Sequence, residues 1–476
     1  MEKSEKERDP CVKISLLNDS FPPVLDGVAN VVTNYAEYLT TQHGAEVVVG
    51  TPRYPDADYS VYPYKVVPYQ SFDTGALLSG YRTGNPFSPK YVAELADFGP
   101  DVIHTHCPAA STMLARLLRE ETGAPVIFTY HTKYDVDIER VLKVKLAAKE
   151  AIRTMVSAVE ACDEVWVVSR GAGENLQTLG YQGAVRVMPN GVDFARGRVA
   201  AETVAEVTAE YDLPAGVPVY LFVGRLMTYK GLPLILDALK LLREKGKDFR
   251  MVIIGKGPDR ELLERQRDEL GLADRCFFIG PVYDRDKLRA WNTRADLFLF
   301  PSTFDTNGLV VREAAACGLA SVLIAGSCAA EDVTDGRNGF LIDETPEAMA
   351  ALLERVGADL PLLRSVGMRA MDEIYLSWAD AVSLAYDRYG AVLEAKRSGA
   401  LPEKKKLPSD LFYSLAAKSL GEQERRRQVW TALQESFRET AVGMMENIQE
   451  AQESAESFRH KLREQLRQDI EELRKR

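Results

Sequence analysis

Two acidic residues, Asp305 and Glu313, stand on either side of a predicted turn and are spaced to bind the hydroxyl groups of a sugar. The apolar run at 296–300 predicts a buried strand of a parallel sheet, and Asn307–Gly308 predicts the turn behind it. Leu309 begins a run of good helix formers. The N–H groups of that helix start would lie at the carboxyl edge of the sheet, where phosphates bind. Because carboxylates accept hydrogen bonds from hydroxyls, the pattern favours a nucleotide sugar over two merely solvated acids.

Two cations, Arg225 and Lys230, lie between a predicted strand at 219–224 and a predicted helix at 232–244. Arginine offers a planar fork of donors and lysine offers a mobile point charge, a pair that suits a diphosphate. The dipole of a helix start opposes nearby cations, so helix stability does not explain them. We therefore expect both side chains to bind the diphosphate of the ligand.

Two glycines mark further places where a ligand could approach the backbone. Gly27 starts a predicted helix at 28–41, where the absent side chain would leave room for a phosphate. Gly255 ends a predicted strand at 251–255 and opens a Gly-x-Gly turn. Each glycine is weak evidence alone, because glycines often serve only as turns.

Three histidines lie at predicted strands of the N-terminal half. His131 ends the apolar run 126–130 at the ligand-facing edge, and we expect it to hydrogen-bond to a substrate rather than act as a covalent nucleophile. His104 and His106 would share one face of an extended strand, so neither is singled out and backbone groups could satisfy either. No acidic ligand accompanies the three at a recognisable spacing, so no metal site is expected.

The order and spacing of these segments resemble the retaining glycosyltransferases of family 4, which have the GT-B fold. The resemblance covers residues 12–396. Its main elements are G-R-L-x-x-x-K-G from Gly224, P-N-G-V-D from Pro189, T-x-H-T around His131, and an E-x7-E motif in which Asp305 stands where the family has glutamate. It implies an α/β protein of two Rossmann-like, doubly wound domains that face a cleft.

The resemblance also implies roles for the candidate residues and a UDP-linked hexose, such as UDP-glucose, as the donor. Side-chain cations would neutralise the leaving diphosphate, so neither a metal nor another cofactor is expected. The residues implied for catalysis are His131, Arg225, Lys230 and Asp305. Those implied for donor binding are Gly27, Arg225, Lys230, Gly255, Asn307, Gly308, Leu309 and Glu313.

A narrower likeness, to bacterial diacylglycerol glycosyltransferases, rests on the segments 21–28 and 129–132. It implies a membrane glycerolipid as the acceptor. Residues 137–160 predict one helix whose basic part, 138–153, follows His131 and would flank the acceptor side. A basic amphipathic helix can lie on an anionic membrane, although such helices also pack on their own sheet.

Composition limits the class of protein. The net charge of −11 argues against broad binding to nucleic acids, and five histidines are too few for a histidine-rich metal site. Six cysteines without a C-x-x-C pair predict free thiols of a cytoplasmic protein. The N-terminus has no apolar segment typical of a signal peptide, and no apolar run approaches 18 residues. We expect a cytoplasmic protein, at most peripheral on the inner face of the membrane.

The chain divides into four predicted parts. An acceptor domain spans 1–195, a nucleotide-sugar domain 196–378, a helix that crosses back 379–400, and a helical tail 401–476. The tail repeats apolar residues from Val429 to Leu473 at helical period. This pattern predicts a stripe that packs on a second copy, a partner protein, a second tail helix at 411–420 or its own domain.

Three functions remain open from the sequence. The first is transfer of a hexose to a membrane glycerolipid, and the second is transfer to a soluble sugar or a polysaccharide. The third is a degenerate transferase that serves as an assembly partner, which the replacement at Asp305 and the added tail would allow.

Overall fold

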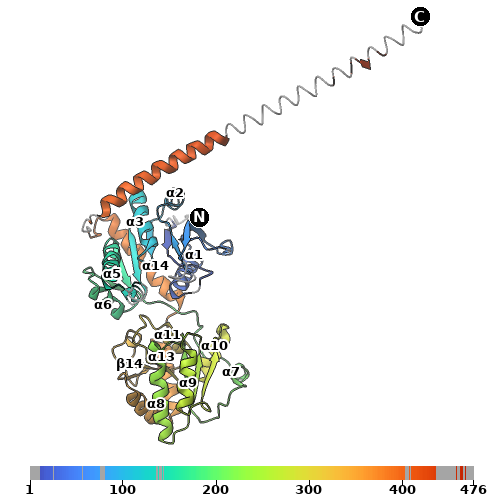
Figure 1. Ribbon diagram of the computed structural model, residues 1–476, viewed down its shortest axis with the longest axis vertical. Helices are drawn as coiled ribbons and strands as arrows, with labels where there is room; N and C mark the ends of the chain where they lie inside the picture. Colours follow the sequence, from blue (N-terminus) through green and yellow to red (C-terminus); the bar gives the residue numbers. More distant parts are fainter. Residues whose placement is uncertain are drawn as a thin grey trace, which may run out of the picture. The chain divides into compact units, whose positions relative to one another are not determined.

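The structure is a computed structural model that describes residues 11–24, 26–55, 57–74, 81–135, 138, 142, 144–402, 407 and 409–435, with 457, 461, 463, 464 and 467. The chain forms two compact units, Met1–Ser414 and Leu415–Arg476, and each is described by itself. The first unit holds two parallel-sheet α/β lobes: the N-lobe, around strands β1–β9, and the C-lobe, around β10–β15 (Figure 1). The predicted fold class is confirmed, whereas the domain boundaries that the sequence predicts at residues 195, 378 and 400 stay predictions.

The N-lobe is built on a seven-stranded parallel sheet. Most residues of its central strands β1, β2, β6 and β7 are buried because helices cover the sheet. Strand β1 pairs with β2 on one side and with β6 on the other, so the strand order reverses beside β1. In the spatial order β3-β2-β1-β6-β7-β8-β9, the strands are Lys65–Tyr69, Glu46–Pro52, Lys13–Leu17, Val102–Thr105, Val126–Tyr130, Glu164–Val167 and Arg186–Val187.

Helix α1, Gly27–Thr41, buries an apolar stripe on the N-lobe sheet. Its N-terminus is capped by Asp26, whose Oδ1 accepts a hydrogen bond of 2.7 Å from the backbone N–H of Ala29. The remaining elements of this lobe are α2 (Pro89–Asp97), α3 (Ala110–Thr122), α5 (Lys145–Glu160), α6 (Arg170–Thr178) and the antiparallel pair β4 (Ser71–Asp73) and β5 (Arg82–Gly84).

One predicted helix of the N-lobe is shorter than expected. Residues 137–160 were predicted as one helix, but Leu142 and Val144 are not helical, and α5 begins only at Lys145. Val144 and Leu146 are 66% and 71% exposed, whereas the buried residues of α5 start at Ala148. Because helices in proteins depend on packing of an apolar face, the helix begins where its side chains reach the core. Residues 136, 137, 139–141 and 143 lie outside the described part of the chain.

The C-lobe is built on a second parallel sheet, of six strands in the order β12-β11-β10-β13-β14-β15. Helices α8, α9 and α12 pack together on one face, and α10, α11 and α13 on the other. The strands in spatial order are Cys276–Gly280, Arg250–Ile254, Val219–Val223, Leu297–Phe300, Ser321–Ile324 and Phe340–Ile342. The helices are α7 (Ala201–Thr208), α8 (Leu232–Glu244), α9 (Arg260–Glu269), α10 (Arg285–Arg294), α11 (Leu309–Ala316), α12 (Pro346–Val356) and α13 (Leu360–Glu373), with 3₁₀ turns η1 (Thr228–Lys230) and η2 (Cys328–Ala330).

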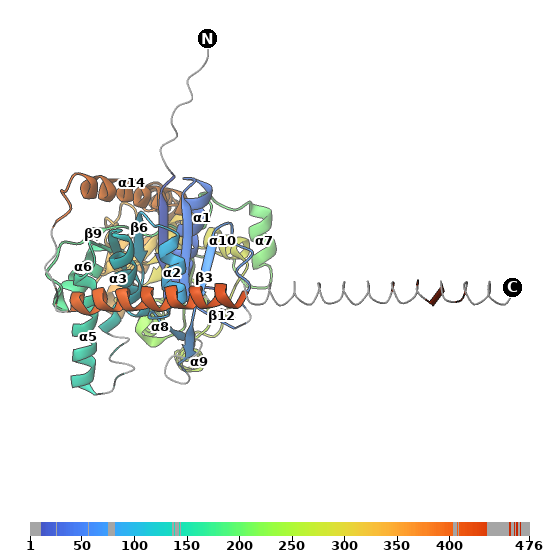
Figure 2. The same ribbon diagram turned by 90° about the horizontal axis from the view of Figure 1, so that it is seen from above.

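The chain crosses between the lobes twice, at neighbouring positions. Val192 forms a β-bridge with Ser377, and a Cβ on Gly191 would lie 2.5 Å from the carbonyl oxygen of Ser377. Directly after this point α14, Trp378–Arg397, returns to the N-lobe and lies alongside α1 (Figure 2). The predicted helix that crosses back to the first domain is therefore present.

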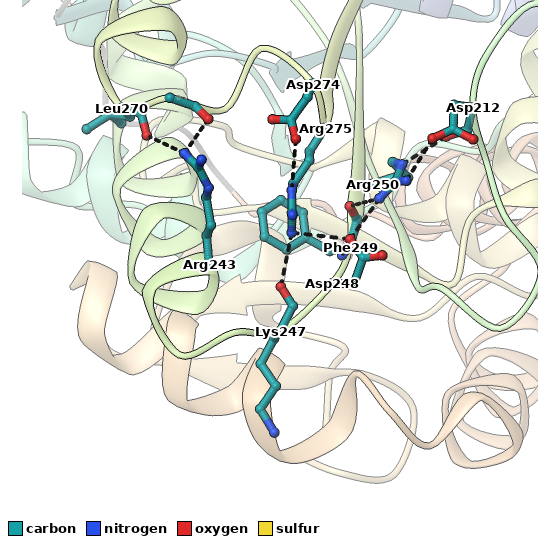
Figure 3. Close-up of polar contacts among 10 residues, drawn as sticks. Asp212, Arg243, Lys247, Asp248, Phe249, Arg250, Leu270, Asp274 and Arg275 are labelled. Atoms are coloured by element: carbon teal, nitrogen blue, oxygen red, sulfur yellow. Dashed lines mark hydrogen bonds and ion pairs between the residues drawn. The ribbon is translucent and has the colours of Figure 1, made fainter.

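A cluster of ion pairs closes the amino-terminal edge of the C-lobe sheet (Figure 3). Arg250, the first residue of β11, donates to Asp212 and Asp248 at 2.7 and 2.8 Å, and Arg275 lies 3.2 Å from Asp248. The guanidinium of Arg275 also lies 5.8 Å from the ring centre of Phe249. These cations are neutralised and lie at the strand starts, so they stabilise the lobe rather than bind a ligand.

The second unit is described by itself up to residue 435 and at five later positions, all helical. Val429 and Leu433, which begin the predicted stripe, are 62% and 46% exposed. The predicted helical extension is thus confirmed for the described residues, and most of the stripe beyond 435 lies outside them. A second copy or partner protein at this stripe stays a prediction.

Candidate functional site

The candidate site is located by the points at which the strand order reverses in the two sheets. In an open α/β sheet, ligands bind outside the carboxyl ends of the strands where the order reverses. In the N-lobe this point lies between β1 and β6, whose following loops lead to Gly27 and His106. In the C-lobe it lies between β10 and β13, whose following loops carry Lys230 and Asp305. The topology therefore brings together residues that are far apart in the chain.

Lys230 and Asp305 form the polar centre of the C-lobe part. The Nζ of Lys230 lies 2.5 Å from Oδ1 of Asp305, and the hydroxyl of Ser302 donates to Oδ2 at 2.6 Å. The rings of Phe300 and Phe304 lie 6.0 and 5.7 Å from Nζ, so the ammonium group is held on several sides. Asp305 has both oxygens engaged and fixes the position of Lys230. Its predicted contact with the hexose stays a prediction.

Arg225 comes from the same loop as Lys230, after β10, and is exposed. Its charge acts on the phenol of Tyr81, a residue of the N-lobe, whose pKa is raised by burial and by a hydrogen bond to Asp26 and is lowered by Arg225. Within the described part of the chain, the guanidinium has no ion-pair partner. Arg225 therefore lies close enough to Tyr81 to act on its charge, and it is unpaired among the described residues, which suits the binding of a diphosphate.

His131 follows β7 and is buried at the contact between the lobes, with 7% exposure. Its Nε2 lies 3.0 Å from Nδ1 of His106, and its carbonyl oxygen accepts a hydrogen bond of 2.6 Å from Thr306 of the C-lobe. Burial lowers the pKa of His131 to about 3, so the ring is neutral at pH 7. Its Nδ1 is buried and has no partner among the described residues, which leaves this atom for a substrate.

Glu313 lies in the second turn of α11 and is tied to a neighbouring cation. Its Oε1 accepts a hydrogen bond of 2.7 Å from Arg285, which also pairs with Asp193 and stacks on Phe194. Burial raises the pKa of Glu313, the charge of Arg285 lowers it, and Asp193 raises it again. The carboxylate keeps further lone pairs for the sugar hydroxyls that the sequence predicts there.

We expect R285M to make nucleotide binding more sensitive to acid. Without the cation, the pKa of the buried Glu313 rises further, so the carboxyl is protonated over a wider range below neutral pH and accepts fewer hydrogen bonds. Calorimetric titration with UDP between pH 5 and 8 is expected to show the loss of affinity at a higher pH in R285M than in the wild type.

A matched control is R275M, which removes a cation from the ion-pair cluster at the opposite edge of the same sheet. Its pH dependence of UDP binding is expected to follow the wild type. Equal shifts in R285M and R275M would contradict the role of Glu313 in binding the ribose.

The candidate glycines differ in their surroundings. A Cβ on Gly27 would meet nothing within 4 Å, so this helix start is open, and its predicted contact with the phosphate stays a prediction. A Cβ on Gly255, whose φ is +148°, would lie 1.8 Å from the carbonyl oxygen of Gly224. Gly255 is therefore required by the close approach of two backbones, and its role in donor binding stays a prediction.

The start of α11 offers hydrogen-bond donors toward the predicted hexose. Gly308 precedes the helix with φ of +58°, and Leu309 is its first residue. The first N–H groups of a helix have no intrahelical acceptor. The amide nitrogen of Asn307 is buried and lacks a partner among the described residues. These groups could bind sugar hydroxyls, as the sequence predicts.

The lobes also touch beside His131. Lys133 donates to the carbonyl of Thr303 at 3.2 Å. Glu331 of the C-lobe accepts hydrogen bonds of 2.7 and 2.6 Å from the backbone N–H groups of Arg170 and Gly171, at the start of α6. Charged and polar contacts thus join the two lobes around the candidate site.

Several residues of the site were not identified from the sequence. His106 was not distinguished from His104, and Thr306, Tyr81 and Arg285 carried no motif. Only His106 could have been identified from the sequence, because it directly follows β6, at the point where the strand order reverses. Across the described residues, no group of three or more His, Cys, Asp and Glu side chains is placed to hold a metal ion.

Comparison with known families matches both lobes. Residues 25–196 match the family described as Glycosyltransferase Family 4, and residues 205–371 match the family described as Glycosyl transferases group 1. Together these regions cover most of both predicted α/β domains and every candidate site residue.

Individual proteins show the same likeness. The chain is 25% identical over 358 residues to alpha-monoglucosyldiacylglycerol synthase of Acholeplasma laidlawii, a match that spans 72% of this chain and 87% of that protein. It is 30% identical over 310 residues to D-inositol 3-phosphate glycosyltransferase of Xylanimonas cellulosilytica, across 61% and 71% of the two chains. The crystal structure of Anabaena HepE in complex with UDP matches in fold, with a TM-score of 0.64, 18% identity and coverage of 80% and 100%.

Proposed function

Because the chain belongs to the family 4 glycosyltransferases and also matches the group 1 glycosyl transferases, we propose that it moves a hexose from a UDP-hexose to a hydroxyl of a membrane glycerolipid, with retention of anomeric configuration. The observation that carries this proposal is the group of polar residues at the two reversals of strand order. Lys230, held by Asp305, and the unpaired Arg225 supply positive charge there. A glucosyl diacylglycerol synthase among the relatives supports the choice of hexose and acceptor.

Each candidate residue has a place in this reaction. Arg225 and Lys230 bind the diphosphate and stabilise the charge that develops as it leaves. Gly27 lets the diphosphate approach the helix start of α1, and Glu313 accepts from the ribose. His131 hydrogen-bonds at the reacting face of the hexose. The groups at Asn307, Gly308 and Leu309 bind its other hydroxyls, and Gly255 lies beside the base.

Retention follows from attack on the same face of the sugar that the diphosphate leaves. The sequence places no carboxylate that could act as a covalent nucleophile on the opposite face. The departing phosphate is then the base that takes the proton of the acceptor hydroxyl. Side-chain cations supply the charge that a divalent ion supplies in other transferases, and activity is expected to persist in EDTA.

A basic groove favours a lipid acceptor over a soluble one. A groove of about 1010 Å³ runs along α5 and is lined by the cations Lys145, Lys149 and Arg153 and by apolar residues that include Ile152 and Val156. Val144 and Leu146 at the start of α5 are exposed, and cationic side chains beside exposed apolar groups suit an anionic membrane surface. None of the helices within the described residues has the length and apolar character to span a bilayer, and we propose peripheral binding at the inner face of the membrane.

Purified protein and a panel of nucleotide sugars test the reaction, with diacylglycerol in vesicles and soluble hexoses as acceptors. Glycolipid formed from UDP-glucose or another UDP-hexose, with the α-linkage visible by NMR, is the expected result. Transfer only to soluble sugars would replace the acceptor proposed here. Failure to hydrolyse or transfer any donor would favour the third function, a degenerate transferase that serves as an assembly partner. Asp305, which stands where the family has glutamate, leaves this function open.

Vesicle flotation tests the membrane surface. We expect the protein to float with vesicles that contain anionic phosphatidylglycerol and to lose affinity when Lys145, Lys149 and Arg153 are changed to glutamine, by about 1 kcal/mol for each charge. The matched control changes Lys240, Lys247 and Arg265, three exposed cations of the C-lobe, to glutamine. Equal loss in both variants would mean that α5 is not the membrane-binding element.

A further inference from the structure

Two buried side chains hold His104 under the carboxyl edge of the N-lobe sheet. Its Nδ1 lies 2.6 Å from the hydroxyl of Tyr389 on α14, and its Nε2 lies 2.7 Å from the hydroxyl of Thr129 on β7. Both ring nitrogens therefore have partners, and the ring is fixed in orientation. His104 has no atom left for a ligand.

His106 is packed against this fixed ring. The two ring centres are 4.0 Å apart, and Tyr35 of α1 meets His106 edge-on at 5.6 Å. His106 has no exposed surface, so neighbouring side chains determine where its ring nitrogens lie. The scaffold of α1, β6 and α14 thus sets the position of Nδ1 of His106.

That nitrogen meets His131. The contact between Nδ1 of His106 and Nε2 of His131 is 3.0 Å long, and the rings stack with centres 5.2 Å apart and planes 20° apart. The other nitrogen of each ring is buried without a partner among the described residues. A buried polar atom without a partner is unfavourable unless a ligand satisfies it, and Nδ1 of His131 is such an atom.

The contact couples the protonation of the two rings. A hydrogen bond between two imidazole nitrogens needs one hydrogen, so exactly one of the two facing atoms carries it. Burial and the neighbouring histidines keep the pKa of His106 well below its usual range, and burial does the same for His131. Both rings are therefore neutral, and one ring proton lies between the two facing nitrogens. The tautomer of one ring thus determines the tautomer of the other.

We propose that His106 is a positioning residue for the proposed hexosyl transfer: its Nδ1 holds Nε2 of His131, selects one tautomer of that ring and leaves Nδ1 of His131 for a hydroxyl of the donor hexose. This inference rests on the proposed function, and it adds a residue that acts through His131 rather than on the substrate.

Three substitutions of His106 distinguish a role in holding the ring of His131 by a hydrogen bond from a role in packing alone. In H106N the amide group can occupy the place of Nδ1, whereas in H106Q it lies farther out, and H106L has no polar atom. We expect H106L and H106Q to lower kcat about 100-fold with little change in the KM of the donor, because the ring of His131 is no longer held. H106N is expected to recover most of the rate.

Equal loss in H106N and H106Q would overturn the proposal, as would wild-type kcat in either H106Q or H106L. Because H106N and H106Q are both polar and similar in size, this comparison holds even if H106L does not fold. The control is H43N, which changes a histidine at the end of α1 that stacks on Tyr386 and bonds to Ser383, and its kinetics are expected to match the wild type.

Nitrogen-15 NMR of the histidine rings gives a readout that needs no substrate. Wild type and H106N are expected to show one tautomer of His131, and H106Q a mixture of both. An unchanged tautomer in H106Q would overturn the positioning role. Because this measurement does not depend on turnover, it distinguishes failure of the inference from failure of the proposed transferase function, which the donor panel alone decides.

Discussion

Replacing Lys230 by alanine is expected to raise the activation free energy of hexose transfer by about 2–4 kcal/mol, or roughly 30- to 900-fold in kcat. The ammonium group lies at the reversal of strand order in the C-lobe and is held 2.5 Å from Asp305. It stabilises charge that grows on the diphosphate as the glycosidic bond breaks, so its loss affects the transition state more than the bound donor. Steady-state kinetics with the preferred nucleotide sugar measure the effect.

The control for this substitution is K240A, which removes a half-exposed lysine from α8 of the same lobe. Its kcat is expected to remain at the wild-type value. Because Lys230 is only 13% exposed, thermal unfolding of K230A must first show a folded protein. A folded K230A with unaltered kcat would contradict the assignment of this cation to the leaving group.

Replacing Gly255 by alanine is expected to destabilise the C-lobe by on the order of 3 kcal/mol or more. The added Cβ would lie 1.8 Å from the carbonyl oxygen of Gly224, and the backbone has a φ of +148° that L-residues rarely adopt. Neither segment can move aside easily, because Gly224 donates to Ile254 and Gly255 donates to Gly280, each at 3.0 Å. Chemical denaturation of the purified variant measures the loss.

The matched substitution is Gly27 to alanine, at the other candidate glycine. Its Cβ would meet nothing within 4 Å, so stability is expected to stay within about 0.5 kcal/mol of the wild type. If the diphosphate approaches the start of α1, the same methyl group weakens donor binding, which titration with UDP detects. Unchanged UDP affinity in this variant would remove Gly27 from the donor site, and a stable G255A would contradict the close backbone approach.

Local pattern was enough to locate most elements of the two lobes. The apolar runs at 219–223 and 297–300 are strands β10 and β13, and the helix predicted from Leu309 is α11. These predictions succeeded because a strand buried on both faces appears as a short continuous apolar run, whereas a helix with one buried face repeats its apolar residues at helical spacing. Of the helix predicted at 137–160, the structure shows α5 only from Lys145, and its buried residues start at Ala148. Where a helix meets the core depends on tertiary packing, which periodicity does not report.

The amino-acid sequence by itself determined the alternation of strands and helices, and with it the set of polar residues that follow the strands, such as Lys230, Asp305 and His131. Only the tertiary structure decided which of them meet. His106 and His131 are 25 residues apart and face each other because β6 and β7 are neighbours in register. The pair of Glu313 with Arg285 depends likewise on where α10 and α11 pack. Such contacts depend on strand register and helix packing between distant segments, which the local spacing of residues does not specify.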